Sequence, residues 1–216
     1  MKKLAILMAF ILGAAFHSAM AAEKTVELQK FTAVNAQKGI ILTIKCADAS
    51  SLNVKGSQSA INKLDIAFDG NMLNLINEAN NKDNSFSERL DITLHTNQPL
   101  NNISIKQGVK AKVAACAVNS EKLKVTGEMG SQIDVEGQTK HLGLELNMGA
   151  IFNEPAQKFR ADSAQISLSM GAKASLCHIP NITGYLTAGA SISVDKDAVV
   201  KIKDNITSHV STSSCS

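Results

Sequence analysis

The chain of 216 residues has no tryptophan, a single tyrosine (Tyr185) and only 4% aromatic residues in all. No basic segment is interleaved with aromatic side chains, which disfavours nucleic-acid binding. So few rings also weaken the prediction of a site that stacks on sugars, although Asn, Ser and Thr can recognise a glycan through hydrogen bonds. Lys and Arg number 22 against 19 Asp and Glu, so neither sign of charge dominates.

Long apolar runs are missing after the first residues, and none approaches the ~20 residues of a transmembrane helix. The start of the chain differs, because Lys2 and Lys3 precede an apolar run that ends near Phe16 and small residues at Ala19 and Ala21. This pattern predicts a Sec signal peptide over residues 1–21. Alanine, rather than the cysteine of a lipoprotein, follows the cleavage site. We therefore expect a periplasmic, secreted or cell-surface protein without membrane insertion after signal removal.

The four cysteines lack the short spacing that is typical of zinc sites. An even number in an exported chain predicts disulfides, and sequence alone permits three pairings. We expect Cys46 to pair with Cys116 and Cys177 with Cys215, so that each bond ties one end of the chain's repeats to a neighbouring segment.

A glycine recurs through the second half of the chain with gaps of 22, 19, 22 and 18 residues, at Gly108, Gly130, Gly149, Gly171 and Gly189. A nearly constant period of this size is typical of a stacked repeat array. Around Gly171, every second residue from Ile166 to Leu176 is apolar. The same alternation surrounds the other four glycines, with exceptions at Gln107, Gly127, Ser131, Glu154 and Gly184. A period of two predicts half-buried strands, and hence an all-β solenoid with coils of about 20 residues. At each glycine we predict a backbone bend with positive φ.

The same alternation places Met129, Met148 and Met170, each just before a glycine, on the inward side of the coils. We therefore predict that they form an interior ladder, because unbranched Met fills irregular gaps in a core. The small residues after the glycines would form the next inward ladder, namely Ser131, Ala150, Ala172 and Ala190. A methionine ladder is also a soft ligand set for copper, which is the alternative to core packing.

Residues 22–100 have strands but no clean repeat, and we expect them to cap and extend the array. Strands are predicted at 51–55, 64–68, 72–76 and 89–96, with a hairpin turn at Gly70. A degenerate first coil is centred on Gly39, and the polar segment 77–88 is expected to be a loop. Regular repeats are assigned to residues 101–206 and a polar tail to 207–216, all of 22–216 forming one domain.

Four segments resemble a known family: "FTAVNAQKGIILTIK", "LNVKGSQSAINKLDIAFDGNMLNLI", "LSMGAKASL" and "LTAGASISV". Over about residues 31–210 the chain is similar to the auto-transporter adhesin, head GIN domain family of bacteria. The resemblance implies a right-handed β-helix at the bacterial envelope or surface, with an adhesive or binding role. It implies no catalytic residues. The chain uses Met-Gly steps where the family has S-G-x-G.

Candidates for catalysis are few. Cys177 and His178 are adjacent, and neighbouring strand residues point to opposite faces, so they cannot meet as nucleophile and base without a turn between them. Carboxylates two residues apart could share a face at Asp134 and Glu136, or at Asp195 and Asp197 with Lys196 and Lys201 nearby. Interspersed lysines favour a solvated strand face at both places. We expect no enzyme activity, cofactor or metal.

The sequence thus predicts an exported, non-enzymatic β-helical protein that serves as an adhesin-like or binding scaffold. Its expected partner is a surface glycan or an envelope protein. Two alternatives remain open: a carbohydrate-active β-helix enzyme, either a polysaccharide lyase or a hydrolase, and a structural envelope protein that self-assembles into homo-oligomers.

Overall fold

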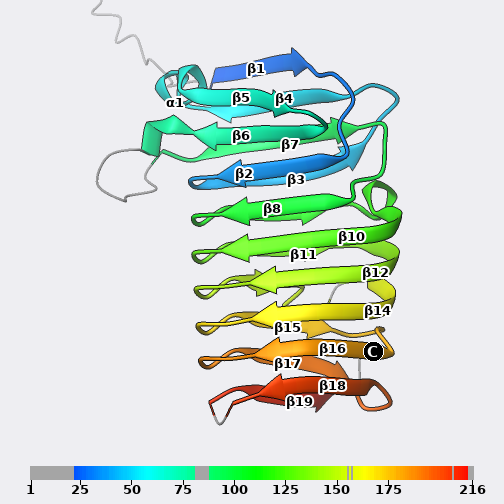
Figure 1. Ribbon diagram of the computed structural model, residues 1–216. Coiled ribbons are helices and arrows are strands. Elements are labelled where there is room, and N and C mark those ends of the chain that lie inside the picture. The colour runs from blue at the N-terminus through cyan, green and yellow to red at the C-terminus, as the bar shows by residue number, and fades with distance from the viewer. Residues whose placement is uncertain (1–21, 81–87, 155, 157, 206, 214–216) are drawn as a thin grey trace, which may run out of the picture.

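The computed structural model describes residues 22–80, 88–154, 156, 158–205 and 207–213, which form an elongated stack of strands (Figure 1). The fold is all-β, as predicted, and contains a β-solenoid. Two sheets of ten and nine strands face each other across the core. Each coil gives one strand to each sheet, and successive coils pair in parallel. The expected signal peptide, residues 1–21, lies outside the described residues.

The coil strands alternate between the two sheets. In the nine-stranded sheet they are β2 (Ala33–Gln37), β8 (Asn102–Lys106), β10 (Asn119–Glu128), β12 (Gly137–Leu146), β14 (Phe159–Leu168), β16 (Asn181–Leu186) and β18 (Val199–Asp204). In the ten-stranded sheet they are β3 (Ile40–Cys46), β9 (Lys110–Val113), β11 (Gln132–Val135), β13 (Ile151–Phe152), β15 (Lys173–Leu176), β17 (Ser191–Asp195) and β19 (His209–Ser213). A 3-10 turn, η2 (Ala115–Ala117), connects β9 to β10.

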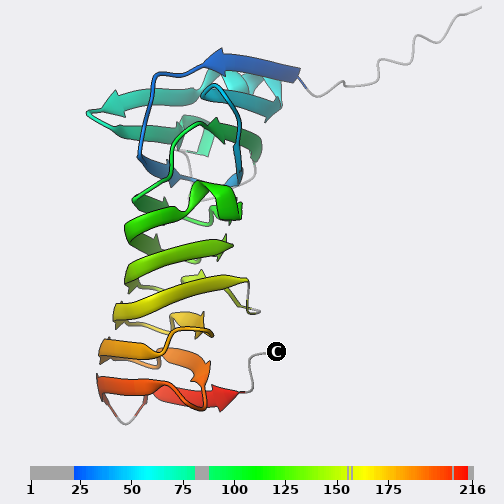
Figure 2. The ribbon, with the colours of Figure 1, turned by 90° about the vertical axis from the view of Figure 1, so that its right-hand side faces the viewer.

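The N-terminal part covers one end of the stack (Figure 2). It consists of β1 (Ala22–Glu27), β4 (Ser51–Gly56), α1 (Gln58–Asn62), β5 (Leu64–Asp69), β6 (Met72–Asn77), η1 (Glu78–Asn80) and β7 (Leu90–Thr96). Strands β6 and β7 pair in parallel with β2 and β3, whereas β1, β4 and β5 pair antiparallel. These antiparallel strands end the solenoid, and the predicted strands and the hairpin at Gly70 are confirmed.

Inward side chains of both sheets fill a continuous apolar core. The predicted alternation is confirmed around Gly171, where Ile166, Leu168, Ala172 and Ala174 are all buried. The predicted ladder of small residues is buried as well, at Ser131, Ala150, Ala172 and Ala190. Burial of this apolar surface is the main force that holds the coils together.

Sharp corners connect the two sheets along one edge of the stack, at the left of Figure 1. The predicted positive φ is confirmed at Gly108, Gly130, Gly149, Gly171 and Gly189, and also at Gly39 of the first coil. The residue before each of these glycines has a positive φ too, as at Met148 with 50°. Two left-handed residues define a type I′ turn. In the coil of Met148 the turn is closed by the Ala150 N–H, which donates to the Asn147 carbonyl at 3.2 Å.

The predicted interior ladder of methionines is wrong. Met129, Met148 and Met170 are exposed, at 41%, 49% and 50% of their surface. The alternation that buries the neighbouring side chains stops at the corner, because the methionine and the glycine both adopt the left-handed conformation. This two-residue turn points the methionine into solvent instead of into the core.

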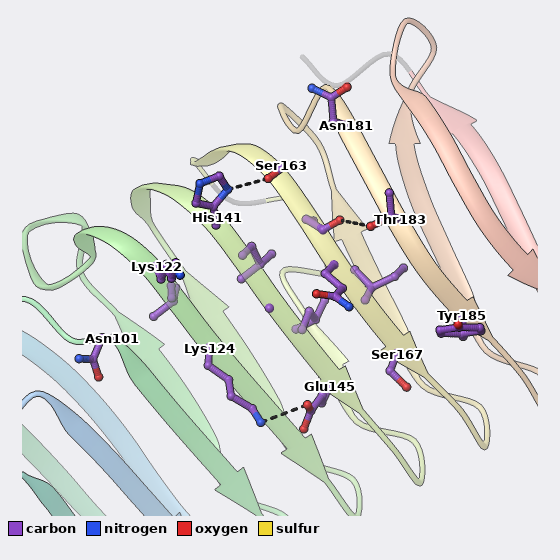
Figure 3. Close-up of a pocket in the computed structure, with 17 residues that line it drawn as sticks. Asn101, Lys122, Lys124, His141, Glu145, Ser163, Ser167, Asn181, Thr183 and Tyr185 are labelled. Carbon is purple, nitrogen blue, oxygen red and sulfur yellow. Dashed lines mark hydrogen bonds and ion pairs between the residues drawn. The ribbon is translucent and has the colours of Figure 1, made fainter.

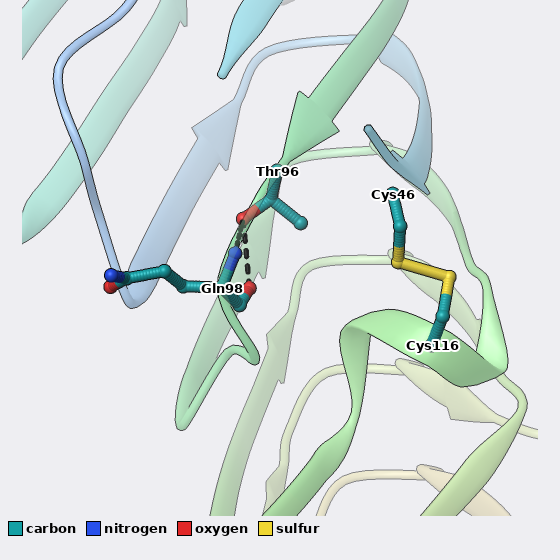
Figure 4. Close-up of a disulfide and its surroundings, with 4 residues drawn as sticks. All are labelled: Cys46, Thr96, Gln98 and Cys116. Atoms are coloured by element: carbon teal, nitrogen blue, oxygen red, sulfur yellow. Dashed lines mark hydrogen bonds between the residues drawn. A yellow bond between two sulfur atoms is a disulfide. The ribbon is translucent and has the colours of Figure 1, made fainter. Parts of the chain in front are cut away.

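The predicted disulfide between Cys46 and Cys116 is confirmed, with a Cα–Cα distance of 6.2 Å (Figure 4). It joins the end of β3 to η2, and Thr96 and Gln98 form a local turn nearby, in which the Gln98 N–H donates to Thr96 Oγ1 at 3.1 Å. Cys215 lies outside the described residues, so its predicted pairing stays a prediction.

Two segments that the sequence predicted to be irregular are a strand in part or lie largely outside the described residues. The segment 207–216, expected to be a polar tail, contains β19, which pairs in parallel with β17 and adds a further strand to the ten-stranded sheet. The expected loop 77–88 falls largely on residues 81–87, outside the described residues. No helix in the described part of the chain has the length and apolar character needed to cross a membrane.

Candidate functional site

An open groove of about 940 Å³ lies on the outer face of the nine-stranded sheet (Figure 3). It crosses β10, β12, β14 and β16, so that four coils contribute side chains. Its outward-facing lining is mostly polar: Asn101, Lys122, Lys124, His141, Glu145, Ser163, Gln165, Ser167, Asn181, Thr183 and Tyr185. Such a lining offers many hydrogen-bond donors and acceptors over an extended surface.

Gly143 makes the middle of the groove hollow. The strand register places Gly143 of β12 between Lys124 of β10 and Gln165 of β14, and Gln165 next to Thr183 of β16. A Cβ built on Gly143 would lie 4.0 Å from its nearest neighbour, the Leu123 carbonyl oxygen. The space above Gly143 is therefore open to a ligand rather than filled by protein atoms.

One side of the groove combines an ion pair with the chain's only tyrosine. Lys124 Nζ lies 3.1 Å from Glu145 Oε1 across neighbouring strands. Tyr185 lies in the same row as Glu145, two coils further along, and is 54% exposed. Lys203 Nζ lies 5.8 Å from the centre of its ring and restricts where the ring can lie. An exposed ring above a polar groove is suited to contact the apolar face of a ligand.

On the other side of the groove, a histidine lies beside a serine hydroxyl. His141 Nδ1 lies 2.9 Å from Ser163 Oγ, and both side chains are accessible. Ser163 is followed in the same row by Asn181 of β16. The Asn181 amide nitrogen donates to the Asp162 carbonyl at 3.3 Å, which holds this side chain at the rim.

A second hollow of about 580 Å³ lies toward the opposite ends of the same strands. Lys140 Nζ and Glu121 Oε1 are 2.7 Å apart in its lining, which also includes Arg160 and Asp162. The hydrogen bond and the charge of Lys140 lower the pKa of Glu121, and the same contact raises the pKa of Lys140. Both groups are thereby kept ionised at neutral pH, which leaves Glu121 unsuited to donate a proton.

The sequence candidates Asp134 and Glu136 line a smaller hollow of about 320 Å³ on the outer face of the ten-stranded sheet. Burial raises the pKa of Asp134, and a hydrogen bond from Gln132 and the charge of Lys112 only partly oppose it. The Gln132 amide nitrogen donates to Asp134 Oδ2 at 3.4 Å. The two carboxylates share a face as expected, beside Lys45 and Lys112.

The other candidate pair does not lie on one strand face. Asp195 ends β17, and Asp197 belongs to the turn that the Ala198 N–H closes with the Asp195 carbonyl at 3.1 Å. The Asp195 carboxylate accepts the backbone N–H of His178 at 2.7 Å. Because His178 has a left-handed backbone with φ 62°, this bond holds a strained turn in place. Asp195 thus has a structural partner on the neighbouring coil.

Cys177 and His178 are not a catalytic pair either. Cys177 is buried, and no described cysteine is a free thiol. Among the described residues, no three His, Cys, Asp or Glu side chains gather in a way that could hold a metal ion. His95 and His141 instead lie beside hydroxyls on separate strands, those of Ser51 and Ser163.

The groove was missed in the sequence, although a signal for it exists. Lys124, Gly143, Gln165 and Thr183 each precede the corner glycine of their coil by six positions. The constant offset places them in one row across the sheet. Aligning the coils on their corner glycines therefore predicts the row, and the single glycine in it marks the hollow.

The fold and the groove define an all-β solenoid with a hollowed, polar outer face. The chain belongs to the family described as "Putative auto-transporter adhesin, head GIN domain", whose model matches residues 30–213. This confirms the resemblance drawn from the sequence.

Solved structures share the fold. A protein from Bacteroides fragilis, described as a putative adhesin, is similar with a TM-score of 0.68 and 15% identity, over 91% of this chain and 98% of that one. A protein from Parabacteroides merdae, also described as a putative adhesin, is similar with a TM-score of 0.52 and 7% identity, over 90% of this chain and 96% of that one. Among curated proteins, none matches this sequence.

Proposed function

We propose that this protein is an exported, non-enzymatic β-solenoid that binds a surface glycan or an envelope protein in the groove of the nine-stranded sheet. The observation that carries the proposal is the groove itself, a hollow of about 940 Å³ that spans four coils. This volume is at the upper end of the range for small-ligand sites, about 300–1,000 Å³, and suits an extended ligand such as an oligosaccharide. The family and the neighbours described as adhesins support the same role.

The chemistry of the lining favours hydrogen bonding to hydroxyl-rich ligands. Gln165, Thr183 and Ser167 present amide and hydroxyl groups in rows that repeat at the spacing of the strands, about 4.8 Å. Tyr185 adds one exposed ring at the edge of these rows. A ligand that lies across the strands would meet hydrogen-bonding groups on several coils, so that many weak contacts add up.

The hydrolase form of the enzyme alternative requires two carboxylates around a scissile bond, one to donate a proton and one to act as base or nucleophile. The described lining of the groove includes one carboxylate, Glu145, and Lys124 is bound to it at 3.1 Å. The acids of the other two hollows lie outside this groove. The arrangement in the groove therefore supports binding rather than hydrolysis.

The location supports the same proposal. The Cys46–Cys116 disulfide indicates an oxidising compartment, such as the periplasm or the cell exterior. The signal-like pattern of residues 1–21 agrees with export. We place the protein in the bacterial envelope or at the cell surface.

The proposal is tested by probing the purified mature protein against an array of bacterial and host glycans, while polysaccharide breakdown is monitored in the same wells. Tyr185→Ala should weaken binding on the order of tenfold, a loss of about 1.4 kcal/mol. Gly143→Gln should abolish binding, because its side chain would occupy the hollow, while its Cβ would lie 4.0 Å from the nearest neighbour, the Leu123 carbonyl oxygen. Release of reducing or unsaturated ends would instead establish the enzyme alternative.

A matched control is available on the other sheet. Ser191 faces outward from β17, and Ser191→Gln adds a similar side chain away from the groove. This variant should bind like the wild type. Equal losses in Gly143→Gln and Ser191→Gln would contradict the assignment of the groove.

A further inference from the structure

The exposed methionines stand in one column along the corner edge of the solenoid. Four methionines follow the predicted signal peptide, and three of them occupy the same position in successive coils: Met129, Met148 and Met170. The fourth, Met72, begins β6 far from the corners. We call Met129, Met148 and Met170 the methionine column.

Neither backbone preference nor core packing accounts for methionine at these positions. The left-handed conformation costs a residue with a Cβ roughly 1–2 kcal/mol, and a type I′ turn prefers Asn at this place. The backbone φ of all three methionines is between 49° and 52°. Each methionine exposes 41–50% of its surface, so the burial of its apolar atoms offsets only part of the backbone energy. The side chains are kept on the surface at the expense of backbone energy.

The corners bring the three side chains to adjacent rungs. The Gly130 N–H donates to the Met148 carbonyl at 2.9 Å, and the Gly149 N–H donates to the Met170 carbonyl at 2.9 Å. Neighbouring rungs are therefore one strand spacing apart, about 4.8 Å. With metal–sulfur bonds of about 2.3 Å, the length found for zinc and cysteine sulfur, two sulfurs on one ion are separated by up to about 4.6 Å, and by somewhat more for the larger Ag(I). The rung spacing thus matches the span of a sulfur–metal–sulfur unit.

We propose that the methionine column binds a soft monovalent metal ion, Cu(I) or Ag(I), through the thioether sulfurs. Thioethers are neutral, polarisable donors that select Cu(I) over hard ions. Glu128 precedes Met129 in the chain, and its charge is paired, because Lys106 lies 3.2 Å from its carboxylate. Met148, at the centre, contributes to any pair of adjacent sulfurs, while its three flexible torsions allow the flanking sulfurs to converge.

The test uses the mature protein with any accessible thiols blocked and its disulfides intact, and with Ag(I) as a probe that undergoes no redox chemistry. NMR of methyl-¹³C-methionine should show the Met129, Met148 and Met170 signals shifting up to one equivalent of Ag(I), with the Met72 signal unchanged. Competition with a Cu(I) chelator then gives the Cu(I) affinity. Zn(II) and Mg(II) should leave all four signals in place. Absence of shifts in the column would overturn the proposal.

Single substitutions locate the metal site, because one should weaken Ag(I) binding and another should strengthen it. Met148→Leu keeps an exposed apolar side chain but removes the central sulfur, and should weaken Ag(I) binding on the order of tenfold or more. Met72→Leu is the matched control and should bind like the wild type. Ala188 occupies the next rung, where the Gly171 N–H donates to its carbonyl at 3.0 Å, so Ala188→Met should tighten binding or add a second ion. Unchanged affinity in Met148→Leu would contradict the proposal.

Discussion

At the scale of single residues, Asp134 combines partial burial with a charge. Its Oδ1 atom is buried without a hydrogen-bond partner among the described residues, and burial raises the pKa of this carboxyl group. The folded protein therefore retains the proton to a higher pH than the unfolded chain. Ionisation at neutral pH thus lowers the stability of the fold, and protonation restores it.

Asp134→Asn should therefore be more stable than the wild type at pH 7, because the amide carries no charge to desolvate. As the pH falls below the ordinary range of an aspartate, near about 3.9, both proteins are neutral at this position and the difference should disappear. Thermal unfolding followed by circular dichroism from pH 3 to pH 8 measures this. Asp65→Asn, at an exposed carboxylate on β5, is the control and should show no such trend. A stability difference between Asp134→Asn and the wild type that does not change with pH would contradict a role for the charge of Asp134.

The corner residues explain the main error in the sequence prediction. The period-two pattern correctly places Leu146 and Ala150 inside, on either side of the corner of Met148. Counting straight through the corner also places Met148 inside, because strand periodicity contains no information about a left-handed pair. The glycine alone predicted one bent residue, whereas the structure has two.

At the scale of elements, β16 packs closely against β14 through a glycine. Gly184 has φ 140°, and a Cβ there would overlap the backbone of Ile166 on the neighbouring strand. The sequence showed Gly184 only as an exception to the apolar pattern. The physical reason is the close approach of two backbones rather than a need for flexibility.

Gly184→Ala should destabilise the fold by about 2 kcal/mol or more, because both the clash and the unfavourable φ must be relieved. Gly143→Ala offers a matched comparison on β12, since its Cβ would face open space. Urea unfolding followed by far-UV circular dichroism suits a chain without tryptophan. Similar losses in both variants would show that strand propensity, rather than backbone contact, governs Gly184.

A strand can also be shortened without loss of pairing. β13 has only two residues, and the side chain of Asn153 continues the ladder in place of the backbone. Its Oδ1 accepts the Val135 N–H at 2.6 Å, and its Nδ2 donates to the Val135 carbonyl at 3.1 Å. Such replacements depend on register between coils, so local sequence patterns cannot predict them. The groove escaped prediction for the same reason, because it too is a property of aligned coils.

At the scale of the whole molecule, the Cys46–Cys116 disulfide spans 70 positions and encloses the chain between β3 and η2. Closing a loop of this length should stabilise the fold by about 4 kcal/mol in the chain-entropy model. The bond therefore supports the N-terminal half much more than a local link would.

Cys46→Ser combined with Cys116→Ser should lower the urea midpoint, with a loss of about 2–4 kcal/mol in the free energy of unfolding. The reduced wild-type protein should lose at least as much stability as the double variant, because reduction also opens the predicted bond between Cys177 and Cys215. Circular dichroism in urea measures both, and the oxidised wild type is the reference. An unchanged midpoint would mean that the bond contributes nothing to stability.

The position of the first coil has a consequence for assembly during export. Strands β2 and β3 come early in the chain, yet they lie inside the stack, with β6 and β7 on one side and β8 and β9 on the other. The four strands that pair with the edges of this first coil are all synthesised after it. A stack that forms in the order of the chain therefore grows outward in both directions from an early coil, rather than layer by layer from one end. Until residues 72–113 arrive, both edges of that coil are unpaired and need protection from association with other chains.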